Sequence, residues 1–167
     1  MTEVPISRGF KSRKSSTDLS SRLPPGQYAT TDFPVLSAGP TPKTNLEKWT
    51  LSLQLDGSLL WKWTWEEFLA LPQTDLKTDI HCVTKWSKLD TNWRGVTIDD
   101  LFAAAGVEDP PEAFLMAHCD GGYTTNLPVE DATGGKAWVA YDYDGEPLDP
   151  QHGGPARLLV PHLYFWK

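Results

Sequence analysis

The alternation of apolar and polar residues predicts the first strands of the chain. Over residues 49–55 the two kinds alternate cleanly, as they do in a half-buried strand. Asp56-Gly57 is a hairpin turn signal, and Trp61, Trp63 and Trp65 continue the alternation beyond it. We therefore predict a β-hairpin whose tryptophans pack in the core and across the strands.

Two short helices are predicted from their capping residues. Thr64 and Glu67 form a capping box that opens a helix over 65–70, which a proline ends. Thr97 caps a second helix over 98–105, and a glycine supplies its C-terminal stop.

The other predicted elements are short and are separated by loops. We predict a buried strand over 80–83, followed by a polar loop over 84–95. Further strands are predicted over 113–117, 123–128, 138–141 and 157–160, without parallel βαβ repeats. Short strands, short helices and long loops indicate an α+β fold with mixed β-sheets.

Length and composition restrict the class of protein. The chain has 167 residues, of which 40% are hydrophobic and 22% charged, as expected for one globular domain. A net charge of −7 argues against nucleic-acid binding, and no apolar run approaches the roughly 18 residues of a membrane span. Residues 1–21 are basic and rich in serine, and we expect a disordered tail there, before a folded domain over 22–167. This tail lacks the apolar segment of a secretory signal, so a cytoplasmic location is expected.

The two cysteines each follow a histidine, in His81-Cys82 and His118-Cys119. Cys82 is placed at the end of an apolar strand, where its thiolate could serve as a nucleophile or as a ligand for a soft metal. It could equally be a buried structural cysteine. A zinc site built from both pairs is opposed by the spacing, because adjacent residues of a strand point to opposite faces.

A glycine-rich segment near the C-terminus, His152-Gly-Gly-Pro-Ala-Arg157, has the character of an anion site. Glycines let the backbone approach an anion closely, and a guanidinium can bind a phosphate in a bidentate manner. Arg94, Arg157 and Lys167 are therefore candidates for holding an anionic cofactor, although each could also be an ordinary surface charge.

Six segments, read in order, resemble one family. They are Asp32-Phe-Pro-Val35, His81-Cys-Val-Thr-Lys-Trp-Ser87, Trp93-Arg-Gly-Val96, Cys119-Asp-Gly-Gly-Tyr-Thr-Thr-Asn126, Tyr141-Asp-Tyr-Asp-Gly-Glu-Pro-Leu148 and His152-Gly-Gly-Pro-Ala-Arg-Leu-Leu-Val-Pro161. Together they resemble the molybdopterin-binding domain of the sulfite oxidase family over roughly residues 22–167. The most similar branch is the small bacterial one that resembles the catalytic subunit of the protein-methionine-sulfoxide reductase.

The resemblance implies a cofactor and a set of site residues. The family binds molybdenum through the dithiolene of one pyranopterin and one cysteine thiolate, and Cys82 matches that metal ligand. Tyr141 matches an active-site tyrosine, which makes it a candidate proton donor or hydrogen-bond partner for the reacting oxygen. Residues that match cofactor-binding positions are Asp32, Phe33, Thr124, Thr125, His152, Arg157 and Lys167. Trp86 and Trp93 flank the cysteine loop and are expected to wall the site from water.

The resemblance also implies an activity. We expect a molybdenum-cofactor-dependent oxidoreductase that transfers an oxygen atom to or from a small sulfur- or nitrogen-centred substrate, with an external electron carrier as its partner. Relatives usually continue beyond position 167 with another basic segment, so a C-terminal segment is expected to be missing. A non-catalytic cofactor-binding or interaction module of the same fold is therefore the alternative.

Overall fold

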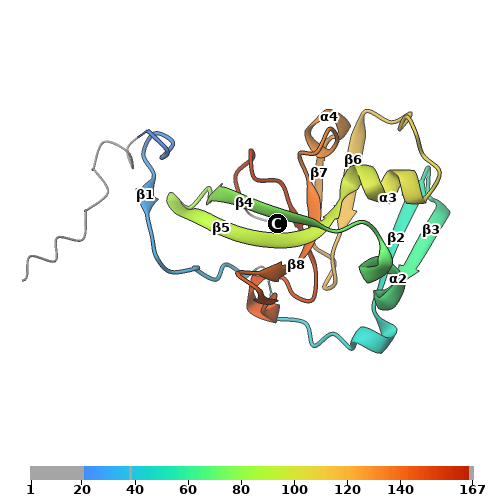
Figure 1. Ribbon diagram of the computed structural model, residues 1–167, viewed down its shortest axis with the longest axis horizontal. Coiled ribbons are helices and arrows are strands. Elements are labelled where there is room, and N and C mark those ends of the chain that lie inside the picture. Colours follow the sequence, from blue (N-terminus) through green and yellow to red (C-terminus); the bar gives the residue numbers. More distant parts are fainter. Residues whose placement is uncertain (1–20, 38, 166–167) are drawn as a thin grey trace, which may run out of the picture.

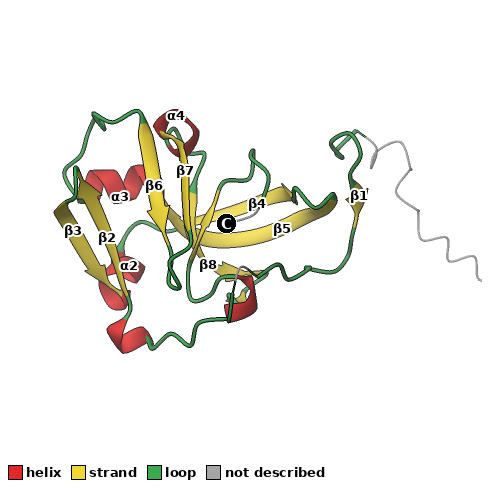
Figure 2. Ribbon diagram, turned by 180° about the vertical axis from the view of Figure 1, so that it is seen from behind, coloured by secondary structure: helices red, strands yellow, loops and turns green. Residues whose placement is uncertain are grey.

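The computed structural model describes residues 21–37 and 39–165. Its strands form a six-stranded mixed sheet and two separate two-stranded sheets, joined by short helices and long loops (Figures 1 and 2). The elements are β1 (Tyr28–Ala29), η1 (Leu46–Lys48), β2 (Thr50–Leu55), β3 (Ser58–Thr64), α2 (Trp65–Ala70), β4 (Thr74–His81), β5 (Trp86–Thr97), α3 (Ile98–Ala104), β6 (Phe114–His118), β7 (Thr124–Pro128), α4 (Val129–Ala132), β8 (Trp138–Tyr143), β9 (Glu146–Pro147), η2 (Pro150–His152) and β10 (Arg157–Leu159). This arrangement confirms the predicted α+β class.

The long strand β5 organises the main sheet. It pairs antiparallel with β4 and β8 and parallel with β1, and β10 pairs antiparallel with the far edge of β8. The predicted polar loop over 84–95 was therefore wrong for most of its length. Its polar residues Ser87 and Thr91 are buried and hydrogen-bonded; the Thr91 hydroxyl, for example, donates to the Thr78 carbonyl at 2.6 Å. The hydrogen-bond partners of these buried residues lie on other segments of the chain. The local sequence therefore looks as polar as that of a loop.

The predicted hairpin is confirmed as β2 and β3, with Leu51 opposite Trp63. Trp63 is buried, whereas Trp61 is 49% exposed, so the expectation of buried tryptophans holds for only part of the strand. Both predicted helix starts are also confirmed. The reciprocal capping box of Thr64 and Glu67 opens α2, and the Thr97 hydroxyl accepts a hydrogen bond from a backbone amide in the first turn of α3.

The strand predicted over 80–83 is the end of the longer β4, which stops at His81, so Cys82 lies outside the strand. The other predicted strands are confirmed as β6, β7, β8 and β10, with bounds that shift by one or two residues. The short helix α4 was not predicted, and it has no side-chain cap that could have signalled it. Gly95 allows β5 to approach β8 closely, because a Cβ at this position would lie 2.4 Å from the Val139 carbonyl oxygen. A side chain there would separate the two strands.

The buried side chains form two clusters. The first, here called the hairpin-side core, lies between the β2–β3 hairpin, the helices α2 and α3, and one face of the main sheet. Its buried members are Trp63, Phe68, Val96, Ile98, Leu101, Phe102, Leu127, Ala132, Ala137 and Val139. The second, the cysteine-side core, covers the opposite face. Its buried members are Ile80, Cys82, Trp86, Trp93, Trp138, Ala140, Leu148 and Leu159.

Two predictions concern the N-terminal tail and membrane-spanning segments. Of the tail predicted over 1–21, all but residue 21 lies outside the described residues. Within the part of the chain that the structure describes, no helix combines the length and the apolar character needed to cross a membrane.

Candidate functional site

Cys82 directly follows β4 and opens the tight turn that leads into β5. Its backbone N–H donates to the Trp86 carbonyl at 2.8 Å, and its carbonyl accepts the Lys85 N–H at 3.0 Å. Lys85 has a φ of +75°, in the left-handed region that lets a chain reverse sharply. The turn directs the Cys82 side chain into the cysteine-side core, where the residue is 1% exposed.

The sulfur of Cys82 has aromatic walls and one polar neighbour. Trp86 and Trp93 are both almost fully buried in the same core, which agrees with the expectation that they wall the site. The Thr84 hydroxyl donates to Cys82 Sγ at 3.1 Å. Such a bond favours the thiolate, which is the form of cysteine that binds metals.

Arg157 extends from β10 toward the same core. It pairs with Ala140 and lies two residues before Leu159, and both of these residues belong to the cysteine-side core. Because alternate residues of a strand share a face, Arg157 lies on that face. One guanidinium nitrogen donates to the His152 carbonyl at 2.5 Å, and the guanidinium carbon lies 4.0 Å from the centroid of the Phe165 ring.

Arg157 is a partly buried cation. Its Nε is buried without a hydrogen-bond partner, and no carboxylate forms an ion pair with it within residues 21–37 and 39–165. Burial lowers the pKa of Arg157 to about 9, while the charges of ionised Cys119 and Cys82 oppose this shift. The guanidinium therefore stays charged at neutral pH and favours an anion beside it.

The predicted residues Phe33 and His152 meet in this region. Their rings stack with centroids 3.8 Å apart and planes within 3° of parallel, and Phe33 also contacts Tyr143 with centroids 5.0 Å apart. Burial lowers the pKa of His152, so the imidazole is neutral at pH 7. Asp32 lies beside Phe33 but is exposed.

Two other predicted site residues lie elsewhere in the fold, and a third is not among the described residues. Thr124 and Thr125 lie on β7, in the separate β6–β7 sheet, where they pair with His118 and Ala117. Of this hairpin, the turn residue Cys119 is the one whose charge affects Arg157. Lys167 falls outside the described residues.

Tyr141 occupies a β-bulge in β8. Arg94 pairs with Asp142 and Gly95 with Ala140, so Tyr141 is the extra residue between them. Its ring packs edge-on against Trp65 and Phe68, with centroids 6.0 Å away in each case, and thus lies against the hairpin-side core. Tyr141 also lines a groove of about 410 Å³ together with Gly154 and Pro155.

The structure adds one functional candidate that the sequence did not indicate. The indole Nε1 of Trp138, in the cysteine-side core, is buried without a hydrogen-bond partner, as is Arg157 Nε. Unpaired buried donors are costly, and their presence in one core suits a site that binds an acceptor-rich group. The signal in the sequence is weak, because a tryptophan in a strand is usually a packing residue.

The side chains around Cys82 distinguish between a zinc site and a site for a soft metal held in a cofactor. Within residues 21–37 and 39–165, no group of three or more His, Cys, Asp or Glu side chains is placed to hold a metal, so the zinc alternative has no support here. A single buried thiol beside a cation and an unpaired indole N–H instead fits a soft metal whose remaining ligands come from an anionic organic group. Cys82, Arg157 and Trp138 are the residues that would hold such a group.

Comparison with known proteins agrees with this chemistry. The family model described as the oxidoreductase molybdopterin binding domain matches residues 38–167. The chain belongs to this family. It is therefore an oxidoreductase domain of the sulfite-oxidase-like type, as the order of its motifs indicated.

The relatives cover different shares of the chain. The uncharacterized oxidoreductase YuiH of Bacillus subtilis is 43% identical over 160 residues, which are 94% of this chain and 78% of that protein. A putative protein-methionine-sulfoxide reductase subunit, YedZ1 of Azospira oryzae, is 30% identical over 63% of this chain and 39% of the relative. The sulfane dehydrogenase SoxCD of Paracoccus pantotrophus superposes with a TM-score of 0.60 at 22% identity, over 72% of this chain and 35% of that one. This last likeness confirms the fold.

Proposed function

We propose that this protein is a molybdenum-cofactor-dependent oxidoreductase that transfers an oxygen atom to or from a small sulfur- or nitrogen-centred substrate. The observation that carries the proposal is the buried Cys82 thiol at a strand end, on the same side of the sheet as the partly buried Arg157, which has no carboxylate partner among the described residues. Membership of the molybdopterin-binding family supplies the class of cofactor.

Each residue of the proposed site has a physical task. Cys82 would provide the one protein ligand to the metal, and the Thr84 hydroxyl would stabilise its thiolate. Arg157 would bind the anionic part of the cofactor, and its burial would strengthen that attraction. Phe33, Trp86 and Trp93 would exclude water from the thiolate. Asp32, Thr124, Thr125, His152 and Lys167 complete the proposed cofactor-binding set.

The bound molybdenum cofactor would supply the two-electron redox chemistry, so the protein needs to bind, orient and tune it. Tyr141 is retained in this proposal as the proton donor for the reacting oxygen. Because its ring packs against Trp65 and Phe68, its hydroxyl would act from the groove that it shares with Gly154 and Pro155. We further propose a small-molecule substrate and a separate electron carrier. The cytoplasmic location stays a prediction.

Metal and pterin analysis tests the proposal. Protein purified from a host that makes the cofactor should contain about one molybdenum and one pterin per chain, the stoichiometry of a single thiolate site. Cys82→Ser should lose the metal, whereas Cys119→Ser, which changes the exposed cysteine, should keep it. Folded protein that retains pterin without turnover would favour the non-catalytic module, and folded protein with neither group would contradict the proposal.

A further inference from the structure

A short segment that precedes the part matched by the family model lies against the Cys82 turn. This segment, residues 22–30, is here called the N-terminal arm, and the family match begins only at residue 38. The Tyr28 N–H donates to the Lys85 carbonyl, and the Thr30 N–H donates to the Ser87 carbonyl, both at 2.9 Å. The arm thus pairs with the first residues of β5, which immediately follow the turn, and Figure 1 shows β1 near this end of the strand.

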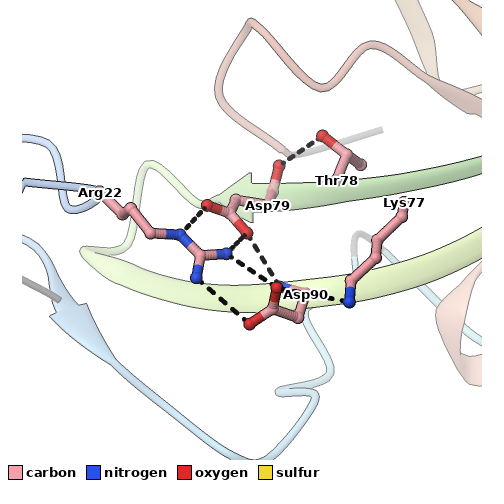
Figure 3. A pocket seen from close by; sticks show the side chains of 5 residues that line it. All are labelled: Arg22, Lys77, Thr78, Asp79 and Asp90. Atoms are coloured by element: carbon pink, nitrogen blue, oxygen red, sulfur yellow. Dashed lines mark hydrogen bonds and ion pairs between the residues drawn. The ribbon is translucent and has the colours of Figure 1, made fainter. Parts of the chain in front are cut away.

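An ion-pair cluster fastens the start of the arm to the sheet. Figure 3 shows Arg22 reaching across to Asp79 of β4 and Asp90 of β5. Its Nε donates to Asp79 at 2.9 Å and a terminal nitrogen donates to Asp90 at 3.2 Å, while a further close contact joins Arg22 to Asp79. A forked guanidinium that binds two carboxylates fixes the arm more firmly than a single exposed pair would.

The arm delivers one side chain, Gln27, to the turn. Its Nε2 donates to the Cys82 carbonyl at 2.8 Å, and its Oε1 accepts the Ser87 hydroxyl at 2.8 Å. Ser87 is completely buried, and its oxygen lies 2.8 Å from His81 Nδ1. Since the Ser87 proton is donated to Gln27, His81 Nδ1 must donate to Ser87. Gln27 therefore bonds directly to Cys82 and to Ser87 of β5, and Ser87 links it to His81 at the end of β4.

These bonds act on the backbone that orients the sulfur. The Cys82 carbonyl already accepts the Lys85 N–H that closes the turn, and Gln27 provides its second donor. With both lone pairs engaged, the peptide plane after Cys82 has little freedom to rotate. Rotation of that plane would move the Cys82 Cα and, with it, the direction of Sγ.

We propose that Gln27 is a positioning residue for the Cys82 thiolate, held in place by Arg22 and acting through its N–H bond to the Cys82 carbonyl. This inference rests on the proposed function, in which that thiolate is the metal ligand. It assigns part of the metal site to the arm, outside the segment that the family model matches.

The first test uses cofactor-free protein in a Cys119→Ser background, in which Cys82 is the remaining thiol of the chain. Gln27→Met preserves length and bulk but removes both hydrogen bonds. We expect iodoacetamide to alkylate Cys82 about tenfold faster in this variant, because the turn opens more often. Gln73→Met is the matched control, since Gln73 also donates its amide to backbone carbonyls, at the end of α2.

The second test uses the molybdenum-loaded protein. Gln27→Met should keep the metal but shift the visible thiolate-to-metal absorption band, while Gln73→Met should leave the band unchanged. Gln27→Glu keeps the acceptor for Ser87 and loses the N–H donor, so it should shift the band as Gln27→Met does. A wild-type band in Gln27→Glu would overturn the role assigned to the N–H donor.

The two proposals fail in different ways. Wild-type protein without molybdenum would overturn the proposed function. Molybdenum-loaded wild type together with equal alkylation rates in Gln27→Met and Gln73→Met, and unshifted bands in both, would overturn the inference about Gln27 alone.

Discussion

The two cores of this protein bury side chains of different character. The hairpin-side core consists of hydrocarbon and aromatic packing around Phe68, under the capped helices α2 and α3. The cysteine-side core contains a thiol, the unpaired indole N–H of Trp138 and, against its edge, the partly buried guanidinium of Arg157. Hydrocarbon packing stabilises a fold, whereas unpaired buried donors cost stability unless a ligand binds them. The first core therefore stabilises the fold, and the unpaired donors of the second are the feature on which the proposed cofactor site rests.

Strand β8 separates the two cores and contributes to both. Trp138 and Ala140 face the cysteine side, and Val139 and Tyr141 face the hairpin side. The bulge at Tyr141 changes the alternation, so that Tyr143 returns to the cysteine side two residues later. Substitutions on the two faces of one strand should therefore have separable effects on stability and on cofactor binding.

The largest expected effect concerns the hairpin-side core. Phe68 is completely buried, and Phe68→Ala should lower the free energy of unfolding by about 3–5 kcal/mol, because it leaves a cavity. Denaturant titration followed by tryptophan fluorescence measures this loss. Molybdenum per folded chain should stay unchanged. A variant that remains folded but loses the metal would show that the cores are not separable.

The next largest effect concerns Arg157, whose replacement should change protein stability and cofactor binding in opposite directions. Arg157→Met should leave the cofactor-free protein as stable as the wild type, or more stable by about 1 kcal/mol, because it removes a partly buried charge that has no counter-charge among the described residues. The same variant should retain the cofactor about tenfold less well, measured as molybdenum per chain after dialysis. Arg94→Met, at an exposed arginine on β5, is the control. If Arg157→Met were less stable than the wild type but retained the cofactor normally, Arg157 would not be a cofactor-binding residue.

A pH series tests the same region by titration. Burial lowers the pKa of both His81 and His152 in the folded protein. As pH falls below about 6.5, the unfolded state binds protons that the folded state does not, so stability should decrease and then level off below the folded pKa values. His152→Gln should reduce the slope, and an unchanged slope would contradict its burial.

The smallest expected effect concerns the bond to the sulfur. Thr84 is exposed, so Thr84→Val should change stability by no more than about 0.5 kcal/mol. Loss of the hydroxyl should nevertheless slow the alkylation of Cys82 in cofactor-free protein at a fixed pH, because the sulfur loses its hydrogen-bond donor. Thr84→Ser keeps the hydroxyl and should react as fast as the wild type. Identical alkylation rates in all three proteins would remove Thr84 from the site.

Elements with local signals could be predicted from the sequence. The β2–β3 hairpin follows from alternation and its Asp-Gly turn, and α2 and α3 follow from the capping threonines Thr64 and Thr97. Strand β5 could not be predicted in the same way. Its buried polar residue Ser87 is satisfied by Gln27, which lies 60 positions away in the sequence. Only the folded chain shows that this serine is internal.

The candidate site follows a similar rule. The motifs identified Cys82, His152 and Arg157, and the structure brings them to one side of the main sheet. The roles of Gln27 and Trp138 were missed, because a glutamine in an arm and a tryptophan in a strand have no local signature of chemistry. Their significance comes from partners, or from the lack of them, that tertiary packing determines.

X-ray absorption at the molybdenum edge tests the central claim most directly, because it detects the atoms bonded to the metal. In wild-type protein loaded with the cofactor, the account predicts one sulfur neighbour of the metal beyond those that the cofactor's dithiolene supplies. The residual metal in Cys82→Ser should have one sulfur neighbour fewer than the wild type, and the metal in Cys119→Ser should have the same number as the wild type. Identical sulfur coordination in the wild type and in Cys82→Ser would contradict the claim that Cys82 binds the metal.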